Sequence, residues 1–471
     1  MTRPRPTVFE RQRPAAALVD RVLAPSRHAV HWLEDAPGER YPALRGGTVA
    51  DLTVVGGGYA GLWTALLARL REPGARVVLL EAGRLGWAAS GRNGGFVSAS
   101  LTHGEPNGRR RWPEEYDTLA RLGRQNLDEL QADVERLGLS CELERTGSVA
   151  VALEPHQVDW AREAGPAFLD AAATRARIDV RPALAGVLDI DETALVHPAR
   201  LVHELARVAV GLGVEVHEGS RVLGLDGGGR RRVVVRTEAG AVLSDRVALA
   251  TNVFPSLVRR SRPLTVPVYD HVLLTEPLSA VQRAAVGWAG REGYEDLGNQ
   301  FHYARLTADD RILFGGYDAV YHAGGRIRAG YEERPATSRR LAAHFLTLFP
   351  QLEDVRFSHR WAGVIDTSTR FCAFHGLARG GRVAYTAGFT GLGVGATRFA
   401  AQVMLDHLAG ERTERTELEM VRRMPLPFPP EPVASVGIGL TRWSMDRADH
   451  EEGRRNLLLR TLDAVGLGFD S

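Results

Sequence analysis

Residues 51–81 constrain the fold more than any other part of the chain. Gly56, Gly58 and Gly61 stand at G-x-G-x-x-G spacing. An apolar run suited to a buried parallel strand precedes them, and leucine and alanine recur at helical spacing after them. A second apolar run then ends at Glu81. Strand, glycine turn, helix, strand and terminal acid in this order predict a βαβ unit that binds a dinucleotide.

The chemistry of a dinucleotide explains each part of this pattern. Glycines permit a tight turn and let backbone N–H groups approach a pyrophosphate at the helix N-terminus. Glu81 follows Gly61 by 20 residues, and its carboxylate can accept hydrogen bonds from both hydroxyls of an adenosine ribose. The same negative charge repels a 2′-phosphate, so the pattern favours FAD or NAD over NADP. An ordinary βαβ turn without a ligand is the alternative.

The composition is typical of a soluble globular protein with two or three structural regions. A net charge of +2 is too small to indicate nucleic acid or an anionic membrane as a partner. No apolar run reaches the roughly 18 residues of a transmembrane helix, and the arginine-rich N-terminus lacks the apolar region of a signal peptide. Cys141 and Cys372 are the two cysteines among 471 residues. We therefore expect no disulfide framework and a reducing, cytoplasmic location.

The chain contains no lysine, so all 59 basic residues are arginine. A Schiff base between the protein and a carbonyl compound is therefore impossible, which excludes pyridoxal phosphate enzymes. Base composition of the source genome is a sufficient explanation for the bias. We expect no metal site.

A second glycine-rich turn lies late in the chain. A strand over 383–387 leads into Gly388–Gly395, and a helix follows. A helix N-terminus carries about half a positive charge and unpaired N–H groups. Beside a flavin pyrimidine, that end would stabilise the negative charge that develops on reduction. A plain strand–turn–helix junction is the alternative. Another predicted strand, 247–250, ends at Thr251, at the expected edge of a ligand crevice.

Four motifs in order resemble the FAD-dependent D-amino acid oxidase superfamily, over about residues 46–410. Within it, the chain is most similar to the gamma-glutamylputrescine oxidoreductase-like amine oxidases. The resemblance implies a mixed α/β fold, with a Rossmann-like, glutathione-reductase-like FAD domain interleaved with an antiparallel β-rich substrate domain. It also implies FAD that is not covalently attached. The motifs are 54–61, 81–95, 360–363 and 387–393.

The resemblance and the periodicity together divide the chain into segments. Residues 266–350 are rich in strand patterns and are the candidate for an antiparallel, substrate-side region. The expected division is an irregular lead-in at 1–45, an FAD domain at 46–112, 195–265 and 360–412, a substrate domain at 113–194 and 266–359, and a helical extension at 413–471.

Residues that match the family's motifs take the roles that the resemblance implies. Glu81 would bind the adenosine ribose, Val222 would present backbone to the adenine, and Thr251 would border the crevice. The pyrophosphate would be held by Gly56, Gly58, Tyr59, Ala60 and Gly61. Ser90, Arg92, Asn93 and Gly94 would run beside the isoalloxazine ring, and Gly391, Leu392 and Gly393 would face its pyrimidine.

The chemistry of the superfamily implies that a neutral amine delivers hydride from its α-carbon to flavin N5, giving an imine that water hydrolyses. The protein must desolvate the substrate and align its C–H bond. An arginine could clamp a carboxylate through two hydrogen bonds, and aromatic rings could form a wall. Each candidate also has an ordinary structural role as its alternative. The candidates are His271, Tyr303, Arg305, Trp361 and Arg370.

Two departures from the family pattern leave the electron acceptor open. Many relatives have histidine where Leu392 stands, and some amine oxidases use a lysine below the flavin, which this chain lacks. An oxidase that uses oxygen is one hypothesis, and a dehydrogenase that passes electrons to a quinone or carrier protein is another. A flavoprotein without turnover and an NAD enzyme are further alternatives. The expected partners are a small amine or amino acid and an electron acceptor.

Overall fold

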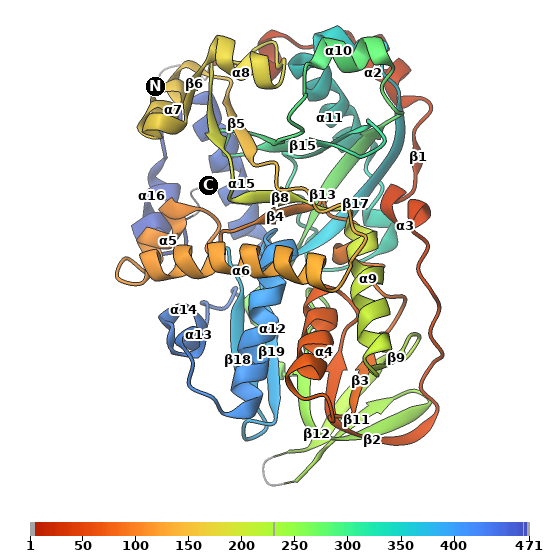
Figure 1. Cartoon of the computed structure of the whole chain (residues 1–471). Coiled ribbons are helices and arrows are strands. Elements are labelled where there is room, and N and C mark those ends of the chain that lie inside the picture. The colour runs from red at the N-terminus through yellow and green to blue at the C-terminus, as the bar shows by residue number, and fades with distance from the viewer. Residues whose placement is uncertain (1–4, 229–230, 465, 469–471) are drawn as a thin grey trace.

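The computed structural model describes residues 5–228, 231–464 and 466–468, and these form two large sheets joined by helices and crossing strands (Figure 1). The outermost residues of the predicted terminal segments, 1–4 and 469–471, lie outside this range, as do 229, 230 and 465. The mixed α/β fold expected from the resemblance is confirmed.

The first sheet is built around the predicted βαβ unit. Strand β2 (Gly46–Val55) pairs in parallel with β3 (Val77–Leu80), and α4 (Tyr59–Arg71) crosses between them. Strand β3 and the end of β2 are largely apolar and buried, because both faces of the sheet are covered there. The remaining strands are β9 (Glu215–His217), β10 (Val222–Gly227), β11 (Val233–Thr237), β12 (Gly240–Leu249), β18 (Phe374–Ala378) and β19 (Val383–Ala387).

Helices α4, α9 (Pro198–Gly211) and α12 (Gly393–Ala409) share one apolar core with this sheet (Figure 1). Helix α6 (Tyr116–Arg136) joins the same core through Leu127 and Leu130. Its Asp133 accepts hydrogen bonds from Arg398 of α12, the nearer at 2.7 Å. This helix lies in the segment 113–194 expected in the substrate domain, yet it packs on the nucleotide half. Helix α5 (Glu105–Arg111) precedes it.

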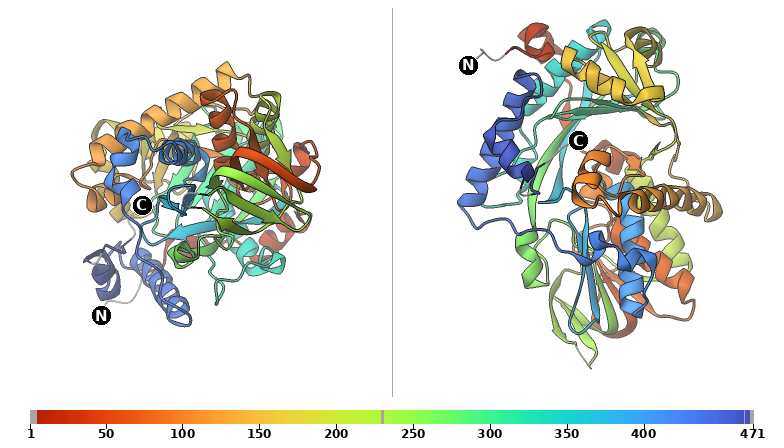
Figure 2. Two further views of the ribbon diagram at one scale, coloured as in Figure 1. Left: turned by 90° about the horizontal axis from the view of Figure 1, so that it is seen from below. Right: turned by 90° about the vertical axis from the view of Figure 1, so that its left-hand side faces the viewer.

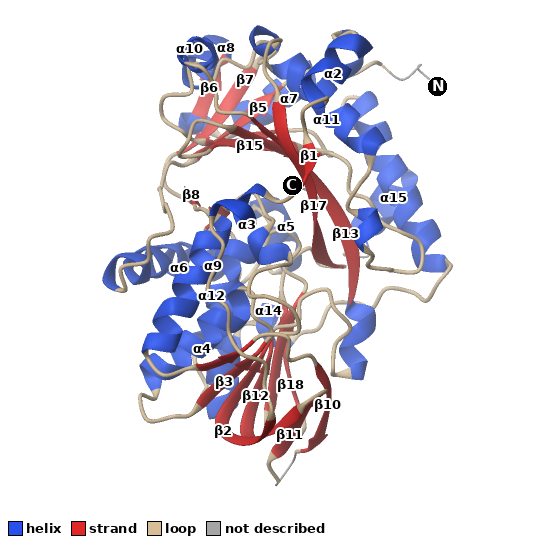
Figure 3. Cartoon of the chain, turned by 90° about the vertical axis from the view of Figure 1, so that its right-hand side faces the viewer, coloured by secondary structure: helices blue, strands red, loops and turns tan. Residues whose placement is uncertain are grey.

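The second sheet has nine strands and lies across the other half of the molecule (Figure 3). Its longest pair, β13 (Thr265–Thr275) with β17 (Phe357–Ser368), is antiparallel. The other strands are β1 (Arg27–His28), β5 (Ser148–Ala152), β6 (Phe168–Asp170), β7 (Ala185–Asp189), β14 (Gly293–Asp296), β15 (His302–Leu306) and β16 (Ile312–Gly316). Around it lie α7 (Pro155–Glu163), α8 (Ala171–Arg177), α10 (Ala280–Val286) and α11 (Pro335–Leu348). A separate two-stranded sheet joins β4 (Phe96–Ser98) and β8 (Thr193–Leu195).

The N-terminal lead-in is more ordered than the expected irregular segment. It contains α1 (Val8–Arg11), α2 (Ala16–Leu23) and α3 (His31–Asp35), and β1 pairs with β17. The reason is burial: apolar side chains of α1 and α2 enter the core beneath the second sheet. The buried indole of Trp32 also donates to Asn93 O at 3.0 Å.

The described part of the C-terminal extension is largely helical and lies on two sides of the molecule (Figure 2). Helices α13 (Glu414–Glu417) and α14 (Glu419–Arg422) follow α12, whereas α15 (Val433–His450) lies along the second sheet. Helix α16 (Leu457–Ala464) packs on α15, and its Asp463 pairs with Arg110 of α5. Asp449 of α15 accepts a hydrogen bond from the Asn299 side chain at 2.7 Å. None of the described helices combines the length and hydropathy needed to cross a membrane.

Candidate active site

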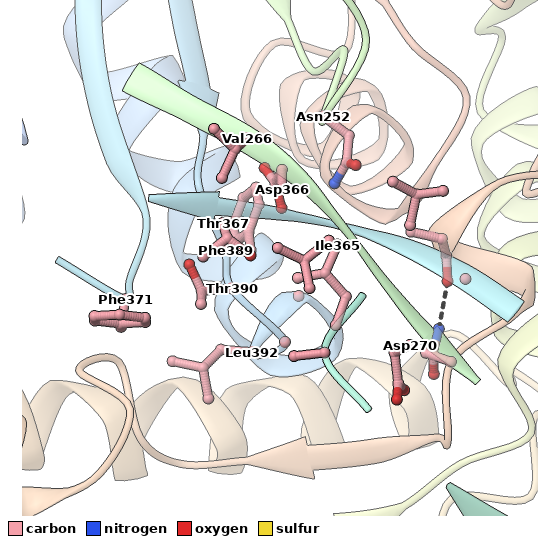
Figure 4. A pocket seen from close by; sticks show the side chains of 18 of the residues that line it. Asn252, Val266, Asp270, Ile365, Asp366, Thr367, Phe371, Phe389, Thr390 and Leu392 are labelled. Atoms are coloured by element: carbon pink, nitrogen blue, oxygen red, sulfur yellow. Dashed lines mark hydrogen bonds between the residues drawn. The ribbon is translucent and has the colours of Figure 1, made fainter. Parts of the chain in front are cut away.

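One cavity of about 1330 Å³ runs between the two sheets. It extends from the glycine turn after β2 to the strands β13 and β17, and α15 contributes to its wall. Figure 4 shows part of this wall, with Asp270 on β13 and Asp366 on β17. A volume of this size suits a ligand as large as a dinucleotide together with a small molecule.

The glycines of the first turn are required by close backbone contacts. Gly56 has a positive φ of 112°, and a Cβ added there would lie 2.3 Å from Ala250 O. A Cβ on Gly61 would lie 1.9 Å from Gly56 O, so only glycine lets α4 start so near the strand end. At Gly58 a Cβ would lie 2.7 Å from Ser90 Oγ and would enter the cradle. The turn therefore fits a pyrophosphate at the N-terminus of α4.

Glu81 anchors the adjoining part of the cavity. Its carboxylate accepts hydrogen bonds from the backbone N–H groups of Gly57 and Gly83, both at 2.7 Å, and from Trp87 Nε1 at 3.0 Å. A carboxylate offers about four acceptor positions, so capacity remains for a ribose hydroxyl. Glu81 is 7% exposed and lines the cavity.

The loop after β3 is held by its own polar side chains. Ser90 Oγ accepts a hydrogen bond from Tyr59 N, at the start of α4, over 3.0 Å. Asn93 Nδ2 donates to Ala89 O and Ser90 O, and its Oδ1 accepts from Gly95 N. These bonds fix the loop without a ligand, which pre-organises a cofactor surface.

Arg92, in the same loop, already has partners. Its guanidinium donates to Trp87 O at 2.8 Å and to Ala362 O at 3.1 Å, and it forms an ion pair with Glu332. This arginine therefore ties the loop to β17 through its Nε and Nη1 atoms.

The structure brings nearly all of the predicted cofactor residues to one cavity. The second glycine turn lies there with Gly391 at a positive φ of 92°, followed by Leu392 and the first residue of α12, Gly393. Gly61 is the exception, since it packs against Gly56 behind the cradle. The predicted residues that line the cavity are Gly56, Gly58, Tyr59, Ala60, Glu81, Ser90, Arg92, Asn93, Gly94, Val222, Thr251, Gly391, Leu392 and Gly393.

Among the five predicted substrate-side residues, Tyr303 lines the cavity and the other four do not. Strand β13 alternates, so Val266, Val268 and Asp270 face the cavity. His271 therefore points away from it, and this side chain is 2% exposed.

The other three candidates bond to backbone instead. Arg305 donates to Val196 O at 2.7 Å and Trp361 Nε1 to Arg92 O at 2.8 Å. Arg370 donates to Arg423 O at 2.8 Å and stacks 5.6 Å from the centre of the Trp112 ring. Their contacts are structural, and we do not assign them to the substrate.

Acidic residues on the sheet wall were missed by the sequence reasoning. Tyr303 donates a hydrogen bond to Asp270 Oδ2 at 2.6 Å, and burial raises the pKa of Asp270 to about 6. Glu295 and Asp296, on β14, also line the cavity. The two-residue alternation of β13 could have pointed to Asp270, because it places Asp270 and His271 on opposite faces of the strand. It does not say which of the two faces is turned toward the cavity.

Asp366 connects this wall to the second glycine turn. Its carboxylate accepts a hydrogen bond from Gly388 N at 2.5 Å, and the neighbouring Asn252 side chain also bonds to it. Figure 4 shows Asn252 and Asp366 close together above the turn. Burial raises the pKa of Asp366 to about 7, against the opposing effect of these hydrogen bonds. A carboxyl group beside the N-terminus of α12 can therefore change protonation near neutral pH.

Comparison with known proteins agrees with this architecture. Gamma-glutamylputrescine oxidoreductase from Escherichia coli (strain K12) is 30% identical over 393 residues, covering 79% of this chain and 86% of the relative. A probable oxidoreductase, OrdL, from Haemophilus influenzae is 27% identical over 392 residues, with the same two coverages. The crystal structure of glycine oxidase from Geobacillus kaustophilus superposes with a TM-score of 0.64 at 19% identity, covering 80% of this chain and 100% of that chain.

A family model described as FAD dependent oxidoreductase matches residues 51–407. The match spans the first glycine turn, most strands of both sheets and most of α12, and it ends before the C-terminal extension. The resemblance to the D-amino acid oxidase superfamily is thereby confirmed, with FAD as the cofactor. The chain belongs to this family of FAD-dependent oxidoreductases, as an enzyme that acts on amines or amino acids.

Proposed function

We propose that this enzyme oxidises the C–N bond of an amine whose ammonium group is recognised by carboxylates. The observation that carries the proposal is the continuous cavity, which joins the nucleotide cradle to an acidic sheet wall. FAD, when bound, would supply the hydride acceptor for this oxidation, and the imine product would be hydrolysed by water. The same residues that line the cradle would hold the cofactor, with Glu81 on the ribose and Gly391 to Gly393 beside the pyrimidine.

The charge of the wall supports an amine over an amino acid. Asp270, Glu295 and Asp296 lie on the sheet side of the cavity. Among the described residues, the arginines that line it are Arg92, Arg221 and Arg442, and none of these belongs to the second sheet. Recognition of an α-carboxylate favours a guanidinium with free N–H donors, and Nη1 of Arg92 is already paired with Glu332.

Asp270 and Tyr303 are the proposed amine-binding pair. The Tyr303 ring packs against the cofactor loop, since a Cβ on Gly94 would lie 2.8 Å from it. The Asp270 carboxyl therefore lies next to the loop that would carry the isoalloxazine ring. A pKa near 6 leaves it ionised at neutral pH, so that it can pair with an ammonium group.

The cofactor is proposed to be non-covalent, because Cys372 is fully buried and does not line the cavity. Both cysteines are free thiols, which supports the reducing cytoplasm expected from the sequence. The acceptor is either oxygen or a quinone or carrier. Stopped-flow reoxidation of the reduced enzyme separates them, because slow reaction with oxygen assigns a dehydrogenase.

Anaerobic bleaching of the flavin absorbance tests the proposal directly. Monoamines and diamines would be compared with α-amino acids of the same chain length. We expect amines to reduce the flavin and matched amino acids to be at least tenfold slower. Asp270→Asn should weaken apparent amine binding about tenfold, the size expected for a lost charge-assisted hydrogen bond. Faster reduction by amino acids would contradict the substrate class, and no bleaching by either would contradict catalysis.

A further inference from the structure

Glu295 is a carboxylate of the cavity wall that has no protein partner. It lies on β14 opposite Tyr303 of β15, and residues opposite each other on paired strands point to the same face of a sheet. Both residues line the cavity, and the Glu295 side chain is exposed there. Among the residues that the structure describes, none donates a hydrogen bond to the Glu295 carboxylate or forms an ion pair with it.

The next acid along the strand, Asp296, is turned the other way. Successive residues of a strand point to opposite faces, and the Asp296 carboxylate lies 2.7 Å from Nδ1 of His302, a fully buried ring. Asp296 is therefore engaged inside the protein. Of the three acids on this wall, Asp270 and Glu295 remain as the two on the face that carries Tyr303.

The Tyr303 ring lies between these two acids. The strand order is β13, β16, β15, β14, so Asp270 and Glu295 stand on the outer strands of this set. A Cβ added to Gly315 of β16 would lie 2.6 Å from both Cζ and Oη of Tyr303, which shows that the ring crosses over β16. Its hydroxyl donates to Asp270 on β13. The ring therefore offers an apolar surface on which a hydrocarbon chain can pack between the two carboxylates.

The separation of the two acids suits a molecule with a positive charge at each end. Adjacent strands lie about 4.8 Å apart, so three steps separate the backbones of β13 and β14 by roughly 14 Å. A charge-assisted hydrogen bond at each end covers about 2.8 Å, which leaves a span suited to a chain of about five methylenes between two ammonium groups.

The surroundings of Glu295 favour a cation beside it. Burial within the protein is the main cause that raises the pKa of Glu295 to about 7, and the carboxylates of Asp296 and Asp189 raise it further. A cationic group would offset these effects, because it favours the ionised carboxylate. An anionic group at the same place would be repelled by all three acids.

We propose that the substrate is a diamine, bound with its reacting ammonium group at Asp270 and its second ammonium group at Glu295. The inference rests on the proposed amine oxidation and names the class of amine that the site prefers. Asp270 lies next to the cofactor loop, so the end held there is the end that is oxidised. Glu295 determines specificity at the far end and does not contact the reacting atoms.

Anaerobic bleaching of the flavin at pH 8 tests this assignment, because Glu295 and the second amine are both charged there. The probes are 1,5-diaminopentane, pentylamine and 6-aminohexanoate, in which a carboxylate replaces the second ammonium group. In the wild type we expect apparent binding of the diamine to be about tenfold tighter than that of pentylamine, the size of one charge-assisted hydrogen bond. Binding of 6-aminohexanoate should be the weakest of the three.

Two substitutions of Glu295 separate specificity from structure. Glu295→Gln keeps the shape of the side chain and removes its charge, so the diamine should bind within about threefold of pentylamine. Glu295→Arg should reverse the order, so that 6-aminohexanoate binds more tightly than the diamine. An equal loss for all three probes would assign Glu295 a structural role and overturn the inference, as would an unchanged preference for the diamine.

Glu276→Gln is the matched control for the change in charge. Glu276 is exposed directly after β13 and does not line the cavity. This variant should keep the wild-type preference for the diamine, and a loss equal to that in Glu295→Gln would contradict a site at Glu295.

Calorimetric titration separates this inference from the proposed oxidation. In holoenzyme whose flavin has first been reduced with dithionite, an amine can bind without being oxidised. The preference for 1,5-diaminopentane over pentylamine, again about tenfold, should appear there and should be lost in Glu295→Gln. If no amine bleaches the oxidised flavin, the proposed oxidation fails, and this ratio still decides whether two ammonium groups are bound. If amines bleach the flavin without any preference for the diamine, the inference fails and the oxidation stands.

Discussion

Asp270 and Asp366 are two carboxyl groups of the cavity wall that can change protonation near neutral pH. Burial raises the pKa of both, to about 6 and about 7. The environment penalises the charged form, and the hydrogen bonds from Tyr303 and Gly388 offset only part of that penalty. Protonation of these two carboxyl groups affects both the charge of the cavity wall and the free energy of unfolding.

Asp366 should make folding stability depend on pH. Its pKa is raised from 3.8 to about 7 by folding, so the folded protein binds the proton more tightly than the unfolded chain does. The contribution is fully present below pH ~4 and is lost as the pH rises through about 7. Between pH 4 and 8, the free energy of unfolding should therefore fall by on the order of 3 kcal/mol more for the wild type than for Asp366→Asn.

Denaturant unfolding at fixed, saturating FAD measures this difference. Asp128→Asn is the control, because the Asp128 side chain is 61% exposed, and its pH profile should follow wild type. If the free energy of unfolding changes with pH in the same way for wild type and Asp366→Asn, the Asp366 carboxyl does not titrate between pH 4 and 8.

Glu81 is the residue on which FAD affinity should depend most. Glu81→Ala removes the acceptor for ribose hydroxyls and also releases Gly57, Gly83 and Trp87. Losing one or two charge-assisted hydrogen bonds should raise the FAD dissociation constant about 10- to 100-fold. Flavin fluorescence titration gives the constant. Glu215→Gln, a 42% exposed side chain on the neighbouring strand β9, should leave it unchanged.

At the level of elements, the glycine turn sets how closely α4 approaches β2. Gly61→Ala would bring a Cβ to 1.9 Å from Gly56 O, a backbone atom that cannot rotate away. The helix must shift, which should lower stability by on the order of 2 kcal/mol and weaken FAD binding as well. Thermal melting and FAD titration measure the two effects. Gly74→Ala, with nothing within 4 Å, is the control, and an equal effect there would contradict the packing argument.

The C-terminal helix α15 forms part of the cavity wall outside the matched family region 51–407. Ile438 lines the cavity, whereas Val436 on the same helix is 59% exposed and does not. Ile438→Trp should lower kcat/KM for bulky amines about tenfold more than for small ones, within the range for steric discrimination in a pocket. Val436→Trp should leave that ratio unchanged. If both variants act alike, α15 does not shape the substrate site.

For the whole molecule, the decisive feature is that one cavity is shared by two sheets. A cofactor that contacts both would stabilise the folded state by mass action, by about 2.7 kcal/mol at 100 times the dissociation constant. Removal of FAD should therefore lower the thermal midpoint by several degrees, and added FAD should restore it in a concentration-dependent way. Adenosine monophosphate, which cannot reach the sheet wall, should restore less. Equal midpoints with and without FAD would contradict a cofactor held between the sheets.

Local sequence patterns predicted the nucleotide-binding half of the molecule but did not predict which side chains face the substrate. The glycine spacing, the apolar runs and the terminal acid all lie within about 30 residues. The chain alone therefore predicts the βαβ unit and its class of ligand. Strand pattern also predicted the strand-rich region 266–350, which contains most of β13, but a period of two leaves the inward face undetermined. His271 was therefore chosen where Asp270 faces the cavity. Arg305 shares a strand face with Tyr303, but it bonds to Val196 O and does not line the cavity.

The sequence by itself determined a dinucleotide-binding fold, because the glycines and the terminal acid stand at fixed spacing along the chain, and its resemblance to a known family implied FAD. Only tertiary structure decided which side chains meet across the cavity. Asp270, Tyr303 and Glu295 come from different strands, and nothing in their spacing predicts that they share one face of a sheet. The strand order β13, β16, β15, β14 brings them together, since residues opposite each other on paired strands share a face and no local pattern specifies which distant strands pair.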